Sequence, residues 1–541
     1  MRLLRLSVPI AVAVAMIAGG LSAVAVEILP PERAIEEVVD HYVDAGLEKD
    51  GIGPAPAADD GTLIRRLTLD LAGRIPTAAE ARAYVGSEDS EKRVRLVDRL
   101  MRSPGFVRYQ ADAFDTMLMA GVRGSVRDYL VRALREDRPW DRIFREILAA
   151  DEAEPGRKGA SEFLKPRAKD LDLLTNDVSS VFFGVNVSCA KCHDHPKVKD
   201  WKQDHFFGLK SFFGRTSQVG NFVAESDFGA VKFKTTAGEE KQARFQFLSG
   251  RTVDVPGVAE PSKEVREEDK KRLDAAKKKK VAPLPPKVSA RARLAEVALL
   301  PGERDFFARS IANRLWQRFH GVGLVMPLDQ MHSANPPSHP ELLAWLARDT
   351  IEHGYDLRRL IRGLVLSRAY ARTSRWESAE PPGPRLFAVA AVRPLSPMQL
   401  ATSLWLATEA PETFPEDLKA EDLDRKIEGL EGRARDLAQG IARPGEDYQI
   451  GAAEALLMSN GDRIKDLLSE KGDRLVSRVA KATDPRERVN LAVRNVLSRP
   501  PEDEESAILR EFLAQHADLP VEGARQLIWS LLTSAEFRFN Y

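Results

Sequence analysis

Apolar residues recur at intervals of three and four along most of the chain, a spacing that places them on one face of an α-helix. The segment PELLAWLARDTIEHG (340–354) is an example, with Leu342, Leu346 and Ile351 near one face. Three segments also open with a capping box, in which a Ser or Thr is followed three residues later by Glu or Gln. They run from Thr77 to Glu80, from Ser338 to Glu341 and from Ser396 to Gln399. The pattern predicts a mainly α fold, in which short helices pack as bundles.

One interval has a different period. Between Asp227 and Val255, the runs VKFKT, ARFQFL and RTVDV alternate apolar and polar residues. The turn signals Ala237-Gly238 and Ser249-Gly250 separate these runs. The alternation predicts a small antiparallel β-insert of about three strands.

A charged segment follows the predicted β-insert. It extends from Lys263 to Lys280, ends in four consecutive lysines, and is followed by VAPLPPK. A charge run followed by prolines is typical of a solvated linker or an exposed helix. We therefore expect two helical-bundle domains on either side of a β-insert and a charged linker. The predicted bounds are a signal peptide at 1–25, a helical domain at 26–218, the β-insert at 219–260, the linker at 261–295 and a second helical domain at 296–541.

Three short phrases resemble one another. They are LVDRLMRSP (96–104), LIRGLVLSR (360–368) and LAVRNVLSR (491–499). They are either vestiges of a helical repeat or similar helix ends that arose independently, and we favour the second interpretation.

The charge balance narrows the function classes. The chain has 541 residues, of which 81 are basic and 81 acidic, so its formal charge is zero. A chain-wide nucleic-acid surface needs a basic surplus, so we expect no nucleic-acid partner. This length also exceeds what one hydrophobic core usually supports, which predicts about two to four domains.

The N-terminal segment has the pattern of an export signal. Arg2 and Arg5 precede an uncharged apolar run that ends in Ala23-Val24-Ala25, the small-x-small pattern of a signal-peptidase site. The alternative is an uncleaved anchor, since 6–26 is long enough to cross a bilayer. Pro9 and the Gly19-Gly20 pair favour cleavage. We expect an exported protein, periplasmic or associated with the cell surface, with no membrane span after cleavage.

The stretch SCAKCHDHPKVKDW (188–201) holds the only two cysteines of the chain. Cys-x-x-Cys-His is the attachment signature of c-type haem. Cys189 and Cys192 would form the two thioethers, and His193 would be the axial iron ligand. The motif uses both cysteines, and the predicted signal directs the chain to the compartment where haem c is attached. We therefore expect covalent haem c as the cofactor.

Three other interpretations of the motif stay open. Cys189 and Cys192 could form a dithiol redox pair, although no βαβ context surrounds them, or a short strained disulfide that requires no cofactor. A zinc or other metal site could instead use Cys189, Cys192, His195 and His205. In the last two cases the protein would be a structural or interaction protein.

The residues around the motif suggest further roles. His195 is too close to His193 to bind the opposite side of a haem iron, so a sixth ligand must come from elsewhere in the chain. The candidates are His205, Met326, Met331, His332 and Met117. Lysines beside the motif could dock an acidic redox partner protein, since charge steers encounter. They are Lys191, Lys197, Lys199, Lys202 and Lys210. Nearby aromatic residues suit either a haem pocket or an ordinary core: Trp201, Phe206, Phe207, Phe212 and Phe213.

With these residues in view, the chain resembles a family of large planctomycete exported proteins. These proteins pair a cytochrome-associated domain of unknown function with a C-terminal companion domain, also of unknown function. The first domain is similar in RRLTLDLAGRIPTAAEARAYV, LVDRLMRSPGF and NVSCAKCHDHPKVKDWKQDHFFGLKSFFGRT. The companion is similar in FARSIANRLWQRFHGVGLVMPLDQMHSANPPSHPELLAWLA, LIRGLVLSRAYARTS and LIWSLLTSAEFRFNY.

The resemblance implies a cytochrome-related context for Cys189, Cys192 and His193 but no established reaction. Two positions depart from the pattern of the family: Val322 replaces a common arginine, and Gln330 replaces a common acidic residue. No G-x-S-x-G, H-E-x-x-H or G-x-x-x-x-G-K-[ST] motif occurs in the chain. An accessory role in degrading extracellular polymers is therefore an alternative supported only by context. Our leading hypothesis is an exported c-type haem protein in periplasmic electron transfer or a redox step.

Overall fold

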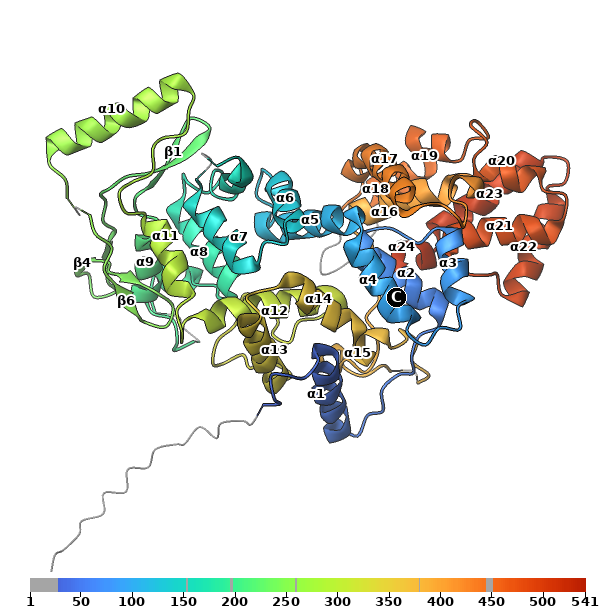
Figure 1. The fold of residues 1–541 in the computed structure, drawn as a ribbon, viewed down its shortest axis with the longest axis horizontal. Helices are drawn as coiled ribbons and strands as arrows, with labels where there is room; N and C mark the ends of the chain where they lie inside the picture. The colour runs from blue at the N-terminus through green and yellow to red at the C-terminus, as the bar shows by residue number, and fades with distance from the viewer. Residues whose placement is uncertain (1–27, 152–153, 195–197, 258–259, 379, 444–450) are drawn as a thin grey trace, which may run out of the picture.

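The structure is a computed structural model that describes residues 28–151, 154–194, 198–257, 260–378, 380–443 and 451–541. These residues form mainly α-helices with short antiparallel strand pairs, so the predicted fold class is confirmed (Figure 1). The predicted signal peptide, 1–25, lies outside the described residues. Within the described ranges, no helix combines the length and the apolar character needed to cross a membrane.

Up to Ser211, the described residues form nine α-helices and three 3₁₀ turns. The helices are α1 (Ile35–Asp50), α2 (Asp60–Ala72), α3 (Ala78–Val85), α4 (Lys92–Arg102), α5 (Pro104–Met119), α6 (Arg127–Arg135), α7 (Trp140–Ala149), α8 (Leu171–Phe183) and α9 (Gln203–Ser211). The 3₁₀ turns are η1 (Pro155–Arg157), η2 (Ala160–Phe163) and η3 (Ser188–Lys191).

The small antiparallel β-insert is present but is larger than predicted. Three separate hairpins are formed by β1 (Thr216–Val219) with β2 (Phe222–Glu225), β3 (Lys232–Lys234) with β4 (Glu240–Gln242), and β5 (Phe245–Gln246) with β6 (Thr252–Val253). Gly238 and Gly250 have φ of +84° and +89° in the turns that the sequence indicated. The first hairpin was missed because Val223, Ala224 and Glu225 are buried one after another, which gives no apolar–polar alternation.

The remaining chain is almost entirely helical. Its helices are α10 (Lys263–Lys279), α11 (Ala290–Ala298), α12 (Arg304–His320), α13 (Pro340–Glu352), α14 (Leu357–Leu366), α15 (Arg368–Ala371), α16 (Pro397–Thr408), α17 (Ala420–Gln439), α18 (Ala452–Asn460), α19 (Asp462–Leu467), α20 (Leu475–Lys481), α21 (Pro485–Leu497), α22 (Asp503–Gln515), α23 (Pro520–Thr533) and α24 (Ala535–Arg538). Two 3₁₀ turns, η4 (Pro384–Leu386) and η5 (Pro411–Thr413), and one strand pair, β7 (Arg393–Pro394) with β8 (Phe539–Asn540), complete it.

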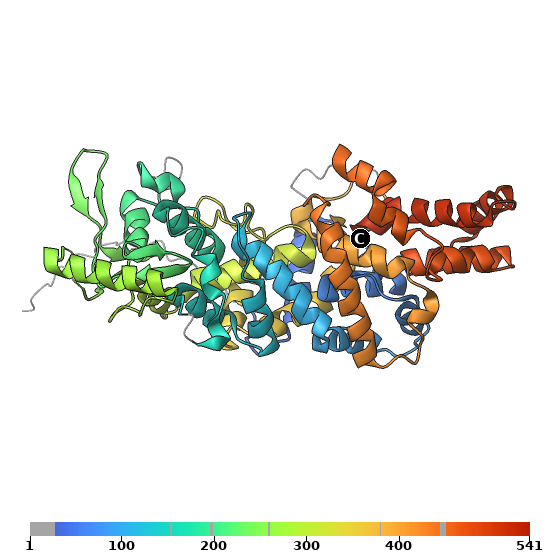
Figure 2. The ribbon, with the colours of Figure 1, turned by 90° about the horizontal axis from the view of Figure 1, so that it is seen from above.

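The charged segment after the β-insert forms the exposed helix that was one of its two predicted forms. Ser262 caps α10, and Ala276 is the residue that this helix buries. In Figures 1 and 2, α10 lies at one end of an elongated molecule and α20 to α23 lie at the other.

Two large hydrophobic cores and one small cluster, Ala58 with Leu63 and Ala371, stabilise the described residues. The first contains buried residues from Ile35 to Ala388, and the second contains residues from Leu395 to Phe537 together with Leu69 and Ile75. Helix α2 contributes to both, since Leu67 packs in the first core and Leu69 in the second. The predicted domain boundaries stay predictions.

Two of the three predicted capping boxes are confirmed. They are those of Thr77 with Glu80 and of Ser396 with Gln399. The third is wrong, because α13 begins at Pro340 and its N-cap is His339 rather than Ser338. Proline favours the first helical position and keeps the preceding residue out of helical geometry, so it moves the N-cap to His339.

A recurring serine turn joins consecutive helices at three places, α4 to α5, α14 to α15 and α23 to α24. Ser103, Ser367 and Ser534 each end one helix and cap the next with nearly the same dihedral angles. Each hydroxyl donates to the carbonyl three residues earlier (2.7–2.8 Å) and accepts from the amide three residues later (3.2 Å). The phrase at 491–499 is different, since Ser498 ends α21 in the left-handed region at φ +64°. The third such turn lies at 531–537 instead.

Candidate functional site

The Cys-x-x-Cys-His motif forms one short exposed turn. Helix α8 ends at Gly184, whose φ of +68° lets the chain reverse toward η3. Cys189 lies within η3 and Cys192 directly after it, and both are exposed free thiols. His193 is also exposed. All three predicted cofactor residues are therefore accessible from solvent on the same turn.

Gln203 holds the backbone of this turn in place. Its buried side-chain amide lies 3.2 Å from the carbonyl oxygen of Cys192 and 3.4 Å from that of Lys191, to which it donates. Its side-chain oxygen accepts from the amide of Thr236 (3.2 Å), and its own backbone amide donates to the Asp194 carboxylate (3.1 Å). One side chain at the start of α9 thus links the motif to the β3–β4 hairpin.

The His193 ring is oriented by a backbone carbonyl. Its Nδ1 lies 2.7 Å from the carbonyl oxygen of Asp194. In the tautomer that donates this hydrogen bond, Nε2 keeps the lone pair that binds a metal. A backbone carbonyl on the other ring nitrogen is a usual partner for a ligating histidine. The donor set of two thiols and this imidazole therefore fits an iron porphyrin attached at the turn.

The lysines near the motif differ in their surroundings. Lys191 and Lys210 both pair with Asp172, at 2.7 and 2.5 Å. Burial acts to raise the pKa of Asp172, but hydrogen bonds from the two lysines outweigh it and lower the pKa. The Asp172 hydrogen bond in turn raises the pKa of Lys191. Lys199 and Lys202 are exposed, and Lys197 lies outside the described residues.

The aromatic residues after the motif form an ordinary core beneath it. Phe207 stacks on Phe233 with ring centroids 4.1 Å apart, and Phe212 contacts Phe245 edge-on at 5.3 Å. All five are buried: Trp201, Phe206, Phe207, Phe212 and Phe213. These contacts are those of an ordinary core, which was one of the two interpretations of these aromatic residues.

The alternative metal set is only partly described. His195 lies outside the described residues. His205 is half-buried on α9, its Nδ1 accepts from the amide of Lys202 (3.1 Å), and burial lowers its pKa. Among the residues with described positions, no group of three or more His, Cys, Asp or Glu side chains is arranged to hold a metal ion.

A loop from the second half of the chain lies directly beside the motif. The backbone amide of Asn186 donates to the carbonyl oxygen of Asp329 (2.7 Å). Its side-chain amide donates to the Asp329 carboxylate (2.9 Å). Val185 pairs with Gln330 in an antiparallel bridge, and the amide of Met331 donates to the carbonyl of Gly184 (3.0 Å). Gln330 contributes backbone atoms to this pairing, so the pairing does not need the acidic residue that the family pattern has there.

The same loop also contacts the residues after the motif. The backbone amide and the hydroxyl of Ser333 each donate to the Asp200 carboxylate at 2.7 Å. Burial acts to raise the pKa of Asp200, but these hydrogen bonds, together with His332 and His205, lower it. Asn186, Gln203 and Asp329 lie in stretches that resemble the family, but no local pattern in the sequence indicated that these three residues position the motif.

The candidates for a sixth ligand come from several elements. Met326, Met331 and His332 lie in or next to the loop that pairs with the motif, and His205 lies on α9. Met117 lies on α5, half-buried against the first core. Their assignment as ligands stays a prediction.

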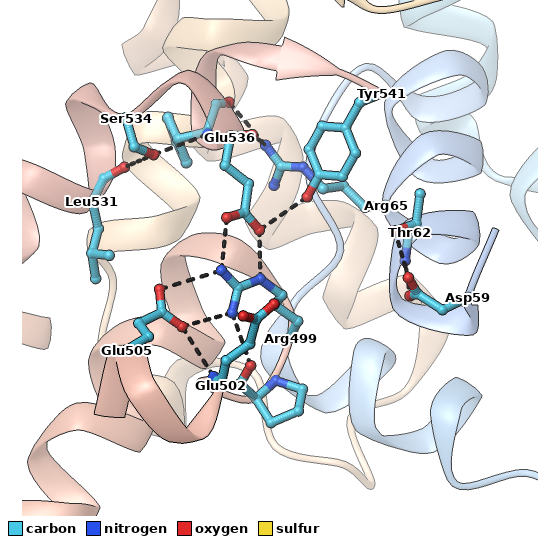
Figure 3. A network of polar contacts seen from close by, with 12 residues as sticks. Asp59, Thr62, Arg65, Arg499, Glu502, Glu505, Leu531, Ser534, Glu536 and Tyr541 are labelled. Carbon is cyan, nitrogen blue, oxygen red and sulfur yellow. Dashed lines mark hydrogen bonds and ion pairs between the residues drawn. The ribbon is translucent and has the colours of Figure 1, made fainter. Parts of the chain in front are cut away.

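A second polar cluster lies elsewhere, where the end of α21 meets α2 and α24 (Figure 3). Arg499 donates to both carboxylate oxygens of Glu536 (2.6 and 2.7 Å) and to Glu505 (2.8 Å). The hydroxyl of Tyr541 donates to Glu536 (3.1 Å), and Arg65 donates to the carbonyl of Phe537 (2.8 Å). The central charges are paired with one another. The hydrogen bond from Arg65 joins α2 to the C-terminal helices.

Comparison with known proteins identifies two domains. Residues 38–218 match the family described as PSCyt2, protein of unknown function (DUF1549). Residues 290–435 match the family described as PSD1, protein of unknown function (DUF1553). The pair of domains of unknown function expected from the sequence is therefore present, with the motif in the first and Asp329 in the second. No curated protein and no solved structure matches the chain.

Proposed function

We propose that this chain is an exported c-type haem protein that acts in periplasmic electron transfer or in a redox step. The observation that carries the proposal is that Cys189, Cys192 and His193 are exposed on one turn, whose backbone is held by a hydrogen bond from Gln203. Two thiols at this spacing and an adjacent imidazole are the groups that covalent haem attachment uses. Export, which the N-terminal pattern predicts, would place the chain in the compartment where attachment occurs.

The chain's own residues would perform distinct tasks. The thiols of Cys189 and Cys192 would hold haem covalently, each through addition of its S–H across one vinyl group of the porphyrin. His193 would offer Nε2 to the iron, with its ring oriented by the carbonyl of Asp194. Haem, when bound, supplies a one-electron iron couple. Gln203 holds the backbone carbonyls of Lys191 and Cys192 on the turn that carries the motif.

The exposed lysines support a docking role. Lys199 and Lys202, which follow the motif, are exposed, whereas Lys191 pairs with Asp172. A positive edge next to the cofactor would steer an acidic redox partner toward it. Lowering ionic strength should then speed electron exchange with an acidic cytochrome, because surface charges are screened less.

The test is expression of the chain in a host with c-type maturation. A Soret band that survives acid–acetone extraction, together with a pyridine haemochrome spectrum, is the expected result. Cys189→Ala with Cys192→Ala should abolish covalent attachment, and His193→Ala should alter the iron spectrum. The matched control is His516→Ala, at the C-cap of α22, which should leave the spectrum unchanged. Colourless protein with free or disulfide-bonded thiols would refute the proposal, and bound zinc without a Soret band would favour the structural metal site.

A further inference from the structure

The C-terminal half of α10 and the segment after it carry a dense positive charge. Between residues 270 and 287 the chain has eight basic residues and one acidic residue, Asp274, although its overall formal charge is zero. The preceding turns, 263–268, hold two basic and three acidic residues. Seven of the eight basic residues are exposed lysines that form no ion pair with a described residue. They are Lys270, Lys271, Lys277, Lys278, Lys279, Lys280 and Lys287.

The acidic groups at the base of α10 do not cancel this charge. Asp269 pairs with Arg272, the eighth basic residue, and Glu225 is buried against Arg291 (3.2 Å). Asp227 is exposed and accepts from a backbone amide (2.7 Å). Even with Asp227 included, seven exposed lysines stand beside two exposed acidic residues, so this surface keeps a positive excess.

Most of the circumference of α10 faces solvent in this region. From 270 to 282, every residue is exposed except Arg272, Leu273 and Ala276. Figure 1 shows α10 as the outermost helix at its end of the molecule. A flat partner surface can therefore reach the lysines.

Two apolar side chains are exposed directly beside these lysines. Val281 follows Lys280 and is 50% exposed, and Leu284 is 75% exposed. The value for Leu284 is the largest for any large apolar side chain among the described residues. Its carbonyl oxygen accepts from Arg272 (2.7 Å), so the backbone is held against α10 while the side chain stays exposed.

The stability of the helix accounts for only part of this arrangement. Lysines in the last turn of a helix are stabilised by the negative end of its dipole, an effect that falls off beyond that turn. The dipole therefore gives no reason for Lys270 and Lys271 in the middle of α10. It also gives no reason for the exposed side chains of Val281 and Leu284.

We propose that residues 270–287 form a docking surface for the anionic headgroups of a phospholipid bilayer. The negative potential of such a bilayer attracts clustered lysines, and apolar side chains among them enter the interfacial layer. A soluble acidic polymer would engage the lysines but offers no apolar layer to Val281 and Leu284. Docking requires no haem, so it can be tested apart from the proposed redox function.

The first test is flotation of the chain, as secreted after signal cleavage, with vesicles of phosphatidylcholine that contain or lack phosphatidylglycerol. Binding to the anionic vesicles should be about tenfold stronger or more, and high salt should reduce it because it screens the lysines. Equal binding to the two kinds of vesicle, or binding to neither, would overturn the proposal.

The second test compares variants at exposed positions, which should not disturb the fold. Lys277→Glu with Lys278→Glu should weaken binding to the anionic vesicles by about tenfold or more. The matched control, Lys465→Glu with Lys471→Glu, changes the charge equally at exposed positions in and after α19 and should bind like the wild type. If both pairs of substitutions weaken binding equally, the assignment to α10 is wrong.

A third comparison separates a bilayer from a soluble acidic polymer. Leu284→Ser should weaken binding to the anionic vesicles by about fivefold or more, because the side chain no longer enters the interfacial layer. The same substitution should leave binding to dextran sulfate unchanged. Binding to dextran sulfate without binding to vesicles would assign the surface to a soluble polymer and refute the bilayer proposal.

Discussion

The side chain of Asn186 donates a hydrogen bond to the carboxylate of Asp329, 143 residues further along the chain, at 2.9 Å. Asn186 lies three residues before Cys189, in the match to the first domain of unknown function, and Asp329 lies in the match to the second. The two domains therefore meet beside the Cys-x-x-Cys-His turn. A change in the second domain can thus alter the environment of the motif in the first.

Replacing Asp329 with alanine should loosen the turn without unfolding the protein. The side-chain hydrogen bond from Asn186 is lost, while the backbone bonds of Asn186 and Met331 remain. We expect a destabilisation of about 1–3 kcal/mol in urea unfolding and faster hydrogen exchange over 184–194. Asp305→Ala, an acidic residue in the first turn of α12, is the control. Equal exchange rates in the two variants would contradict the predicted link.

Gln203→Ala should make the cysteines more reactive in protein without haem. The substitution removes partners from the carbonyl oxygens of Lys191 and Cys192 and from the amide of Thr236. The loss should cost about 1–3 kcal/mol and increase motion of the turn. Alkylation of Cys189 and Cys192 by iodoacetamide, followed by mass spectrometry, measures the effect. Gln218→Ala, an exposed glutamine on β1, should leave the rate unchanged, and an unchanged rate in Gln203→Ala would refute the bracing role.

The ion pair of Glu80 with Arg74 should make stability depend on pH in the acid range. Burial acts to raise the pKa of Glu80, but Arg74 and the amide of Thr77 lower it from 4.5 to about 2. Because the folded pKa is below the unfolded one, the pair stabilises the fold above pH 4.5 and this contribution is lost as the pH falls toward 2. Its size is about 3 kcal/mol.

Glu80→Gln should therefore be less stable than the wild type at pH 7, and the difference should shrink as the pH falls toward 2. Urea unfolding at a series of pH values measures this. Glu416→Gln is the control, since Glu416 pairs with Arg82 at an exposed site and should contribute little. A difference between Glu80→Gln and the wild type that does not vary with pH would contradict the assignment.

The serine turns should contribute unequally to stability. Ser367 is fully buried, and its replacement by alanine leaves the Leu364 carbonyl and the Tyr370 amide without the hydroxyl. We expect a loss of about 2 kcal/mol in thermal or urea unfolding for Ser367→Ala and about 1 kcal/mol for Ser103→Ala. Ser506→Ala, within α22, should be nearly neutral. If Ser367→Ala were as mild as Ser506→Ala, the turn would not be a stabilising cap.

Much of the local structure followed from short sequence patterns. The boxes at Thr77 and Ser396 depend on residues three positions apart, and both were predicted correctly. The Ser338 box failed because the adjacent Pro340 moved the N-cap. The likeness of LAVRNVLSR to the other two phrases did not extend to the turn, because Ser498 ends its helix in the left-handed region.

By itself, the sequence determined the helical class, the presence of a small β-insert, the exposure of the charged segment and the motif at Cys189, Cys192 and His193, because each depends on residues near one another in the chain. Only the tertiary structure decided that the 326–335 loop packs against 184–187, that Gln203 holds the motif, and that Arg499 pairs with both Glu505 and Glu536. Many of these contacts use backbone amides and carbonyls, which every residue type shares, so their partners leave no pattern in the sequence.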